Sequence, residues 1–133
     1  MNPNEFVFEY NDYPLIPLKF YYEKKETPYI EALLDSGGDF IVIPLAIARF
    51  LKLKLEKAGN VDTAGGTTSL FRATVDMTLG SAEEKIKYSK LEIHVSMRND
   101  IPVLLGRCPI FEDYEIIFKK HKKQLILTPI KTL

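Results

Sequence analysis

The segment that decides the fold reads Ala32-Leu33-Leu34-Asp35-Ser36-Gly37-Gly38-Asp39, an apolar run that ends at a carboxylate. Taken alone, Asp-Ser-Gly is a common β-turn, because Asp and Ser favour turns and Gly adopts positive φ. Apolar residues also follow the turn, at 40–43, so we expect an internal turn with a buried carboxylate. Such a carboxylate is costly unless it is hydrogen-bonded, protonated or functional, which makes Asp35 the first candidate for chemistry.

Alternation of apolar and polar residues with period two dominates the rest of the chain and predicts strands. The clearest runs are 15–22, 29–34, 71–79 and 91–97, and a hairpin is expected from 116–118 and 125–127 around the basic run 119–123. Pro44 suits the start of a short helix over 44–51, and a helical turn is predicted at 109–114. The pattern therefore predicts a mainly β, barrel-like fold with one or two short helices.

The composition predicts one domain over residues 1–133, with a core over about 15–127. Lys and Arg number 18 and Asp and Glu number 18, so the formal charge of zero argues against nucleic-acid and anionic-membrane binders. A single Cys makes neither an internal disulfide nor a Cys-rich zinc site. We find no long apolar run and no basic leader, and we expect a cytoplasmic protein with no membrane span.

Three motifs, in order, resemble those of the retropepsins, the retroviral-type aspartic proteases. The segment 32–39 looks like the catalytic loop of that family, which reads Asp-Thr/Ser-Gly-Ala after an apolar strand. The segment Pro102-Val103-Leu104-Leu105-Gly106-Arg107 resembles its second signature, in which apolar residues precede Gly-Arg and a short helix. Residues 59–79 look like the flap hairpin. The resemblance covers most of 15–127 and implies a closed β-barrel of the acid-protease type.

The resemblance implies a role for each residue of the loop. Asp35 would be the catalytic aspartate, and the Ser36 hydroxyl would brace the loop against its symmetry mate. Gly37 would let the backbone turn tightly, while Gly38 stands where the family usually has Ala, which loosens the loop. Asp39 would hydrogen-bond the substrate backbone.

Further contacts are implied outside the loop. Arg107, which follows Gly106, would pair with Asp39, and a bidentate guanidinium is well suited to fixing a carboxylate. Main-chain groups at the flap tip, Ala64, Gly65 and Gly66, would bind an extended peptide. Candidates for apolar subsites are Ile41, Ile43 and residues 64–67.

The chemistry of this family requires two carboxylates. One acts as general base toward water and the other, protonated, acts as general acid toward the carbonyl oxygen. Two such groups about 3 Å apart share a proton and titrate as a pair. Because the chain supplies one good candidate, the expected assembly is an isologous homodimer with Asp35 from each copy. No metal or cofactor is required.

Other arrangements have simpler explanations. Asp62-Thr63-Ala64-Gly65 lacks Gly at its third place and lies too near Asp35 for a duplicated lobe. Glu92, His94 and Ser96 lie on one strand face about 7 Å apart, too far for a relay, so a solvated face is expected. The two histidines lack ligand-spaced partners for zinc. Cys108 is interpreted as a buried small hydrophobe, and residues 119–123 as a solvated turn.

The sequence therefore predicts an aspartic endopeptidase that acts on an extended peptide or protein. An alternative hypothesis is a retropepsin-fold module that binds peptide or protein without turnover. A third, weaker hypothesis is a nucleic-acid contact through the basic run 119–123.

Overall fold

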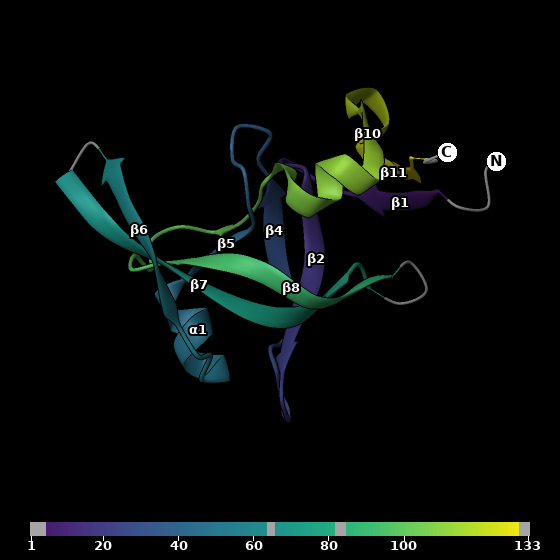
Figure 1. The fold of residues 1–133 in the computed structure, drawn as a ribbon. Helices are drawn as coiled ribbons and strands as arrows, with labels where there is room; N and C mark the ends of the chain where they lie inside the picture. The colour runs from purple at the N-terminus through teal and green to yellow at the C-terminus, as the bar shows by residue number, and fades with distance from the viewer. Residues whose placement is uncertain (1–4, 64–65, 82–84, 131–133) are drawn as a thin grey trace.

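The computed structural model describes residues 5–63, 66–81 and 85–130 (Figure 1). Its helical segments are α1 (Leu45–Leu51), η1 (Arg107–Phe111) and η2 (Lys120–Lys122). The strands of the described residues, in chain order, are β1 (Phe6–Glu9), β2 (Leu15–Tyr22), β3 (Lys25–Glu26), β4 (Ile30–Leu34), β5 (Val42–Pro44), β6 (Glu56–Thr63), β7 (Gly66–Leu79), β8 (Ile86–Ser96), β9 (Val103–Leu105), β10 (Tyr114–Lys119) and β11 (Gln124–Pro129).

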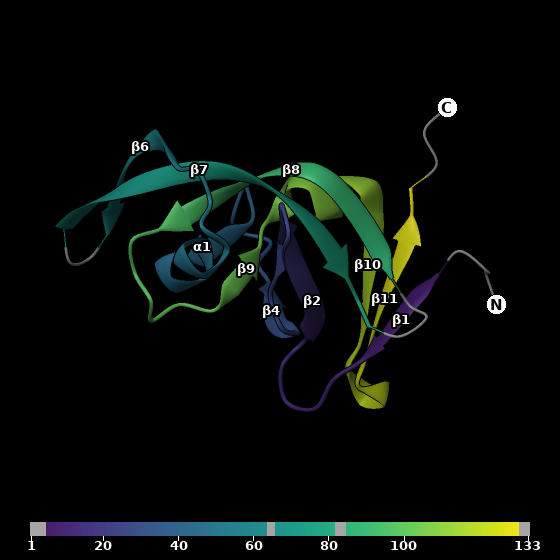
Figure 2. The same cartoon turned by 90° about the horizontal axis from the view of Figure 1, so that it is seen from below.

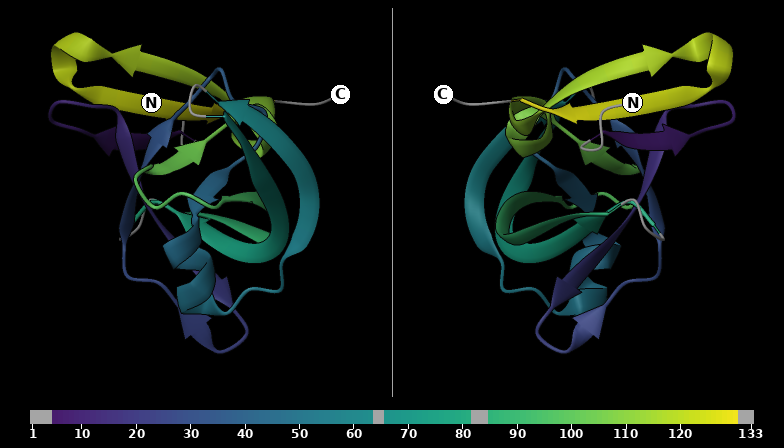
Figure 3. Two further views of the ribbon diagram at one scale, coloured as in Figure 1. Left: turned by 90° about the vertical axis from the view of Figure 1, so that its left-hand side faces the viewer. Right: turned by 90° about the vertical axis from the view of Figure 1, so that its right-hand side faces the viewer.

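The main sheet closes on itself as a barrel. Its hydrogen-bonded order runs β2-β4-β9-β5-β8-β7, and β7 pairs again with β2, so these six strands form a ring. Strand β3 extends the sheet beside β2, and β6 extends it beside β7. Figure 3 shows the ring of strands from two sides. The predicted mainly β, barrel-like fold is confirmed.

Local alternation accounts for the long strands of the barrel. The predicted strand 15–22 is β2, and its side chains Ile16, Leu18 and Phe20 are fully buried on one face. The run predicted at 71–79 lies within the longer strand β7, and the run predicted at 91–97 lies in β8 except for Met97, which follows the end of the strand. These strands pair in antiparallel register, which lets each bury one face and expose the other.

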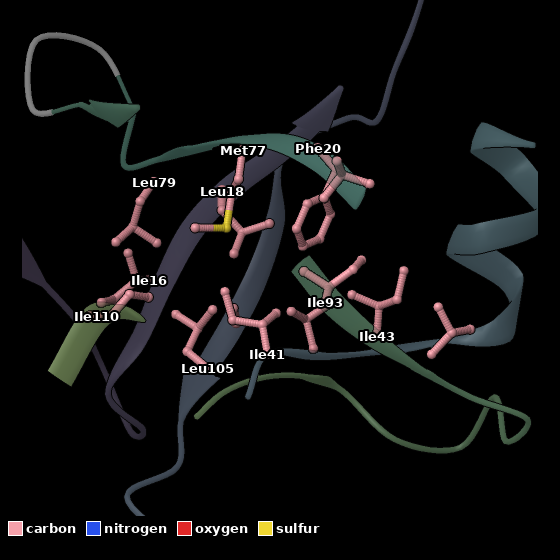
Figure 4. Packing of buried hydrophobic residues seen from close by; sticks show 14 of the residues in the cluster. Ile16, Leu18, Phe20, Ile41, Ile43, Met77, Leu79, Ile93, Leu105 and Ile110 are labelled. Carbon is pink, nitrogen blue, oxygen red and sulfur yellow. The ribbon is translucent and has the colours of Figure 1, made fainter. Parts of the chain in front are cut away.

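Apolar side chains from all sides of the ring meet in one cluster (Figure 4). Fully burying one such side chain stabilises the fold by about 1.5–3 kcal/mol, so this cluster is the main source of stability. The cluster contains Ile41 and Ile43, both with no exposed surface, packed with residues of β2, β7 and β8. Its large, fully buried members are Phe20, Ile16, Leu18, Ile41, Ile43, Leu51, Met77, Leu79, Ile93, Leu105, Ile110 and Leu125.

Helix α1 begins one residue later than predicted, because Pro44 still has the extended backbone of β5. A distant loop caps its first turn: the Ala46 amide donates to Asn99 Oδ1 at 2.7 Å. The helix ends at Lys52, which adopts the left-handed conformation with φ of 55°. The chain then continues toward β6. The cap ties α1 to the end of β8, although no local cap residue precedes the helix.

A second, three-stranded sheet has the order β1-β11-β10. The hairpin predicted around residues 119–123 is present, and η2 forms its turn with residues 120–123 exposed. Figures 1 and 2 place this sheet on the opposite side of the molecule from the β6–β7 hairpin. Among the described residues, no helix has the length and apolar character needed to cross a membrane.

Candidate active site

Asp35 lies where two parallel strands end. Strand β4 pairs with β9 up to Leu34 and Leu105, and the Asp35 amide adds one more hydrogen bond, to the Leu105 carbonyl at 2.9 Å. The chain then turns, since the Gly38 amide donates to the Asp35 carbonyl at 3.2 Å. The Gly37 amide donates to Asp35 Oδ1 at 3.1 Å. The half-buried carboxylate is therefore held by its own loop at the end of the β4–β9 pair.

Arg107 holds the second half of the loop. Its amide donates to the Gly38 carbonyl at 2.9 Å, and its Nε donates to the same oxygen at 3.3 Å. Its Nη2 donates to Asp39 Oδ1 in an ion pair. The amide of the next residue, Cys108, donates to the Asp39 carbonyl at 2.8 Å. The structure thus brings together Asp39 and Arg107, 68 positions apart, through backbone and side chain.

Gly106 allows this close approach. A Cβ atom at this position would lie 2.3 Å from the Phe40 carbonyl oxygen and 2.8 Å from its carbonyl carbon and amide nitrogen. Real Cβ atoms essentially never lie so close to backbone atoms. The sequence indicated this glycine only through the Gly-Arg signature. Its steric reason is tertiary, because it depends on the loop around Phe40.

The glycines of the loop have a different role from the one expected. Neither Gly37 nor Gly38 has a positive φ, so the tight turn expected at Gly37 does not need the freedom of glycine. A Cβ atom would instead approach the Asp35 carboxylate, at 3.4 Å from Oδ1 for Gly37 and 3.2 Å from Oδ2 for Gly38. The two glycines leave open space beside the carboxylate.

An open hollow of about 600 Å³ adjoins the loop. Ser36, which is exposed, is one of the residues that line it. Sequence reasoning missed most of the other lining residues, since they combine the loop with the helical segment η1 and share no local motif. The lining residues are Ser36, Asp39, Phe40, Arg107, Cys108, Phe111 and Glu112.

The expected hairpin between residues 59 and 79 is formed by β6 and β7, with Asp62 opposite Thr67 and Thr63 opposite Gly66. Asp62 therefore lies in an antiparallel ladder, as expected for a hairpin strand. Gly66 has a φ of +117°, a conformation that favours glycine. Ala64 and Gly65, predicted at the tip, lie outside the described residues.

The prediction that Ile41 and Ile43 line apolar subsites is wrong for this chain. Both side chains have no exposed surface. Figure 4 shows them within the core, close to Phe20 and Ile93. Thr67, which belongs to the other predicted subsite segment, residues 64–67, is exposed. The mistake has a physical reason: apolar residues after a catalytic turn serve equally well as strand core.

The strand face that carries Glu92, His94 and Ser96 is solvated only in part, since Glu92 is exposed and the other two residues are half-buried. His94 is half-buried, not solvated, and its ring packs on Phe40 with centroids 4.5 Å apart. Ser96 Oγ accepts a hydrogen bond from the Arg98 amide at 3.1 Å. No relay is formed by these groups. Burial lowers the pKa of His94 below its usual value of 6.5, and Arg72 acts in the same direction.

Cys108 is half-buried, and burial is the main reason that the pKa of its thiol is raised. A raised thiol pKa disfavours the nucleophilic thiolate, in keeping with a packing role. Within the described ranges, no three His, Cys, Asp or Glu side chains gather in a way that could hold a metal ion.

Comparison with solved structures identifies the fold. A retropepsin-like aspartic protease from Rickettsia conorii superposes with a TM-score of 0.67 at 18% identity, over 92% of this chain and 98% of that one. The fold is retropepsin-like. The EIAV protease in complex with the inhibitor HBY-793 superposes with a TM-score of 0.54 at 19% identity, over 79% of this chain and 91% of that one. No family model and no curated protein matches the sequence.

Strands of the retropepsin-like barrel position the residues of the active-site loop. Strands β4, β9 and β5 of the ring position Asp35, Asp39 and Gly106, and η1 supplies Arg107. The chain offers a carboxylate at the end of paired strands, a guanidinium that fixes its neighbour, and a hairpin on the same barrel. A carboxylate placed in this way is a candidate for acid–base chemistry.

Proposed function

We propose that this chain is an aspartic endopeptidase that works as a homodimer, with Asp35 from each copy at the two-fold axis. The observation that carries the proposal is the position of Asp35 in a retropepsin-like barrel, at the end of the β4–β9 pair and hydrogen-bonded by its own loop. Similarity at 18% identity supports the fold, while the activity is inferred from the site.

The need for a second copy follows from the contacts of Asp39, the other carboxylate of the loop. Asp39 is engaged by the Arg107 guanidinium. This ion pair commits the Asp39 carboxylate to Arg107. A second Asp35 is free of this constraint. A two-fold axis beside the loop would bring two identical, half-buried carboxylates together.

The proposed reaction is hydrolysis of a peptide bond. The ionised Asp35 accepts a proton from water as the water oxygen attacks the carbonyl carbon, and the protonated Asp35 donates its proton to the carbonyl oxygen. The resulting tetrahedral diol collapses when the protonated carboxyl group donates its proton to the amide nitrogen, the C–N bond breaks, and the other carboxylate takes a proton from a diol hydroxyl as the carbonyl group re-forms. The dyad ends with one shared proton, as it began. No cofactor enters the reaction.

The substrate in this proposal is an extended peptide or protein segment, held by main-chain hydrogen bonds between the loop and the hairpin. The β6–β7 hairpin, in which Thr63 pairs with Gly66, would act as the flap. Asp39, paired with Arg107, would hydrogen-bond the backbone of the substrate. A cytoplasmic location remains a prediction.

The test is cleavage of a peptide library, read by mass spectrometry, for the wild type and Asp35→Asn. We expect the variant to remain folded and to lose cleavage by at least about 100-fold, because proton transfer by a positioned group contributes about that much or more. Asp12→Asn is the matched control, since Asp12 is exposed in the loop between β1 and β2. It should cleave as the wild type does.

The dimer is tested separately by sedimentation and by the dependence of rate on protein concentration. At low concentration the specific activity should fall as the dimer dissociates. Unchanged cleavage by Asp35→Asn, or full specific activity in a monomeric sample, would contradict the proposal. Peptide binding without cleavage by either protein would favour the binding-module alternative.

A further inference from the structure

A row of side chains crosses the barrel from β6 to the active-site loop. Glu56 on β6 lies opposite Arg72 on β7, and Arg72 lies opposite His94 on β8. The first two are joined by an ion pair of 3.2 Å between Arg72 Nε and Glu56 Oε2. Because facing residues in antiparallel strands have Cβ atoms about 4.5–5.5 Å apart, the row is continuous across three strands.

His94 contacts the active-site loop at two points. Its amide donates to the Ile41 carbonyl at 2.8 Å, so its backbone is fixed to the residue that ends the loop. Its ring packs on the Phe40 ring at 4.5 Å, with an interplanar angle of 43°. The Phe40 backbone is in turn covered by Gly106, which approaches too closely to admit a Cβ atom. Phe40 is therefore held by the His94 ring and by the chain at Gly106.

We propose that His94 is a positioning residue of the active-site loop, and that it holds Phe40 and the adjoining Asp39 in place only while its imidazole is neutral. The inference rests on the proposed function for its effect on substrate, because Asp39 is a proposed substrate-binding residue. The packing of the loop itself is measurable without catalysis.

The groups around His94 determine whether its neutral or its protonated form is favoured. Burial is the main influence and lowers the pKa of His94, Arg72 on β7 also lowers it, and Glu92 on β8 raises it. Toward the loop the imidazole packs on the apolar Phe40 ring, and on β5 the residue paired with His94 in register is the apolar Val42. Across the sheet, Glu56 is occupied by Arg72. Among the charged groups of these described neighbours, Glu92 alone raises the pKa of His94.

A lowered pKa means that the folded chain binds this proton less readily than the unfolded chain does. The packed arrangement is therefore fully favoured above about pH 6.5 and is weakened as the pH falls from there toward the pKa of the folded state. If Phe40 is held less firmly, Asp39 should also move, because the two residues are adjacent in the chain. In the proposed enzyme, substrate binding should then weaken on the acid side, while the Asp35 dyad is untouched.

The first test is an NMR titration of the amides of residues 39–41 and of the His94 ring. In the wild type, these amides should share one midpoint with His94, below pH 6.5. In His94→Phe, which keeps an aromatic ring but cannot titrate, this component should vanish. His121→Gln is the matched control, since His121 lies exposed in η2, and it should behave as the wild type.

A second variant covers the case in which His94→Phe fails to fold. Phe40→Leu removes the ring partner, and the His94 midpoint should then move up toward 6.5 because its burial decreases. An unmoved His94 midpoint in Phe40→Leu would overturn the inference. So would amides of residues 39–41 that ignore His94 in the wild type, or that keep the same component in His94→Phe.

Cleavage assays separate this inference from the proposed function. In the wild type, KM should rise roughly 2- to 10-fold as His94 protonates, the range that an aromatic contact supplies. The kcat should not follow this midpoint, and KM in His94→Phe should lack the rise. A rise that persists in His94→Phe would overturn the inference. A wild type that cleaves nothing would refute the proposed function, and the NMR titration would then decide the positioning role.

Discussion

Gly106→Ala is the substitution for which the structure gives the sharpest expectation. The new methyl group would lie 2.3 Å from the Phe40 carbonyl oxygen and 2.8 Å from two further backbone atoms. Overpacking a well-packed site costs about 1–3 kcal/mol, and the upper value applies here because backbone atoms cannot rotate away. The segments around residues 40 and 106 must separate, which strains the hydrogen bonds between Arg107 and Gly38.

The expected loss can be expressed as a melting temperature. The entropy of unfolding, about 2.1 cal/mol/K per residue, gives roughly 0.28 kcal/mol/K for 133 residues. A loss of about 3 kcal/mol therefore lowers Tm by roughly 11 °C. Scanning calorimetry at one fixed protein concentration measures it, because the Tm of a dimer depends on concentration.

Gly37→Ala is the matched control. It places the same methyl group in the same loop, at an ordinary van der Waals distance of 3.4 Å from Asp35 Oδ1 and without a positive φ to forbid it. Its Tm should stay within about 3 °C of the wild type, since such a change alters stability by less than about 1 kcal/mol. A Gly106→Ala protein that melts within that same range would refute the steric reasoning.

Three further predictions concern hydrogen bonds. Thr27→Val should lower the free energy of unfolding by about 1–3 kcal/mol in urea titrations, because buried Thr27 accepts from the Phe20 amide at 3.0 Å; Thr27→Ser should retain most of it. Arg107→Lys should cost about 1 kcal/mol by the same measurement, since its exposed ion pair contributes little and one guanidinium–carbonyl bond is lost. Tyr88 donates to Asp113 at 3.0 Å, and burial raises the pKa of its phenol above the usual 10. The unfolded chain therefore loses this proton first, and the wild type should lose stability above about pH 10 relative to Tyr88→Phe, as alkaline unfolding curves would show.

The long strands were predictable because each carries its own pattern. Strand β2 has the predicted bounds, since alternation over eight residues needs no knowledge of its partners. Strands β5 and β9 have three residues each and exist only through their partners in the ring. Three residues are too few for an alternation of apolar and polar side chains to distinguish a strand from a loop. Strand β1 was missed for the same reason, as its pairing with β11 joins distant parts of the chain.

The candidate site likewise combines residues that the sequence indicated with contacts that only the folded chain creates. Asp35 was indicated by its own neighbours in sequence, and the contact of Asp39 with Arg107 by resemblance of two motifs. The burial of Ile41 and Ile43 and the packing of His94 on Phe40 depend on which face of a short strand turns inward. The need for glycine at 106 depends on a backbone 66 positions earlier. Such contacts are properties of the assembled barrel.

The 68-residue separation between Asp39 and Arg107 has a consequence for synthesis on the ribosome. Contacts so far apart in sequence form late, because a long loop must close before they contribute. The turn at Asp35 leaves the ribosome seconds before Arg107, at about 5–20 residues per second. During that interval the loop lacks the guanidinium that holds it and the strand β9 that supports Asp35. For that interval the nascent chain carries Asp35 without the hydrogen bonds and the neighbouring strand that hold it in the folded barrel.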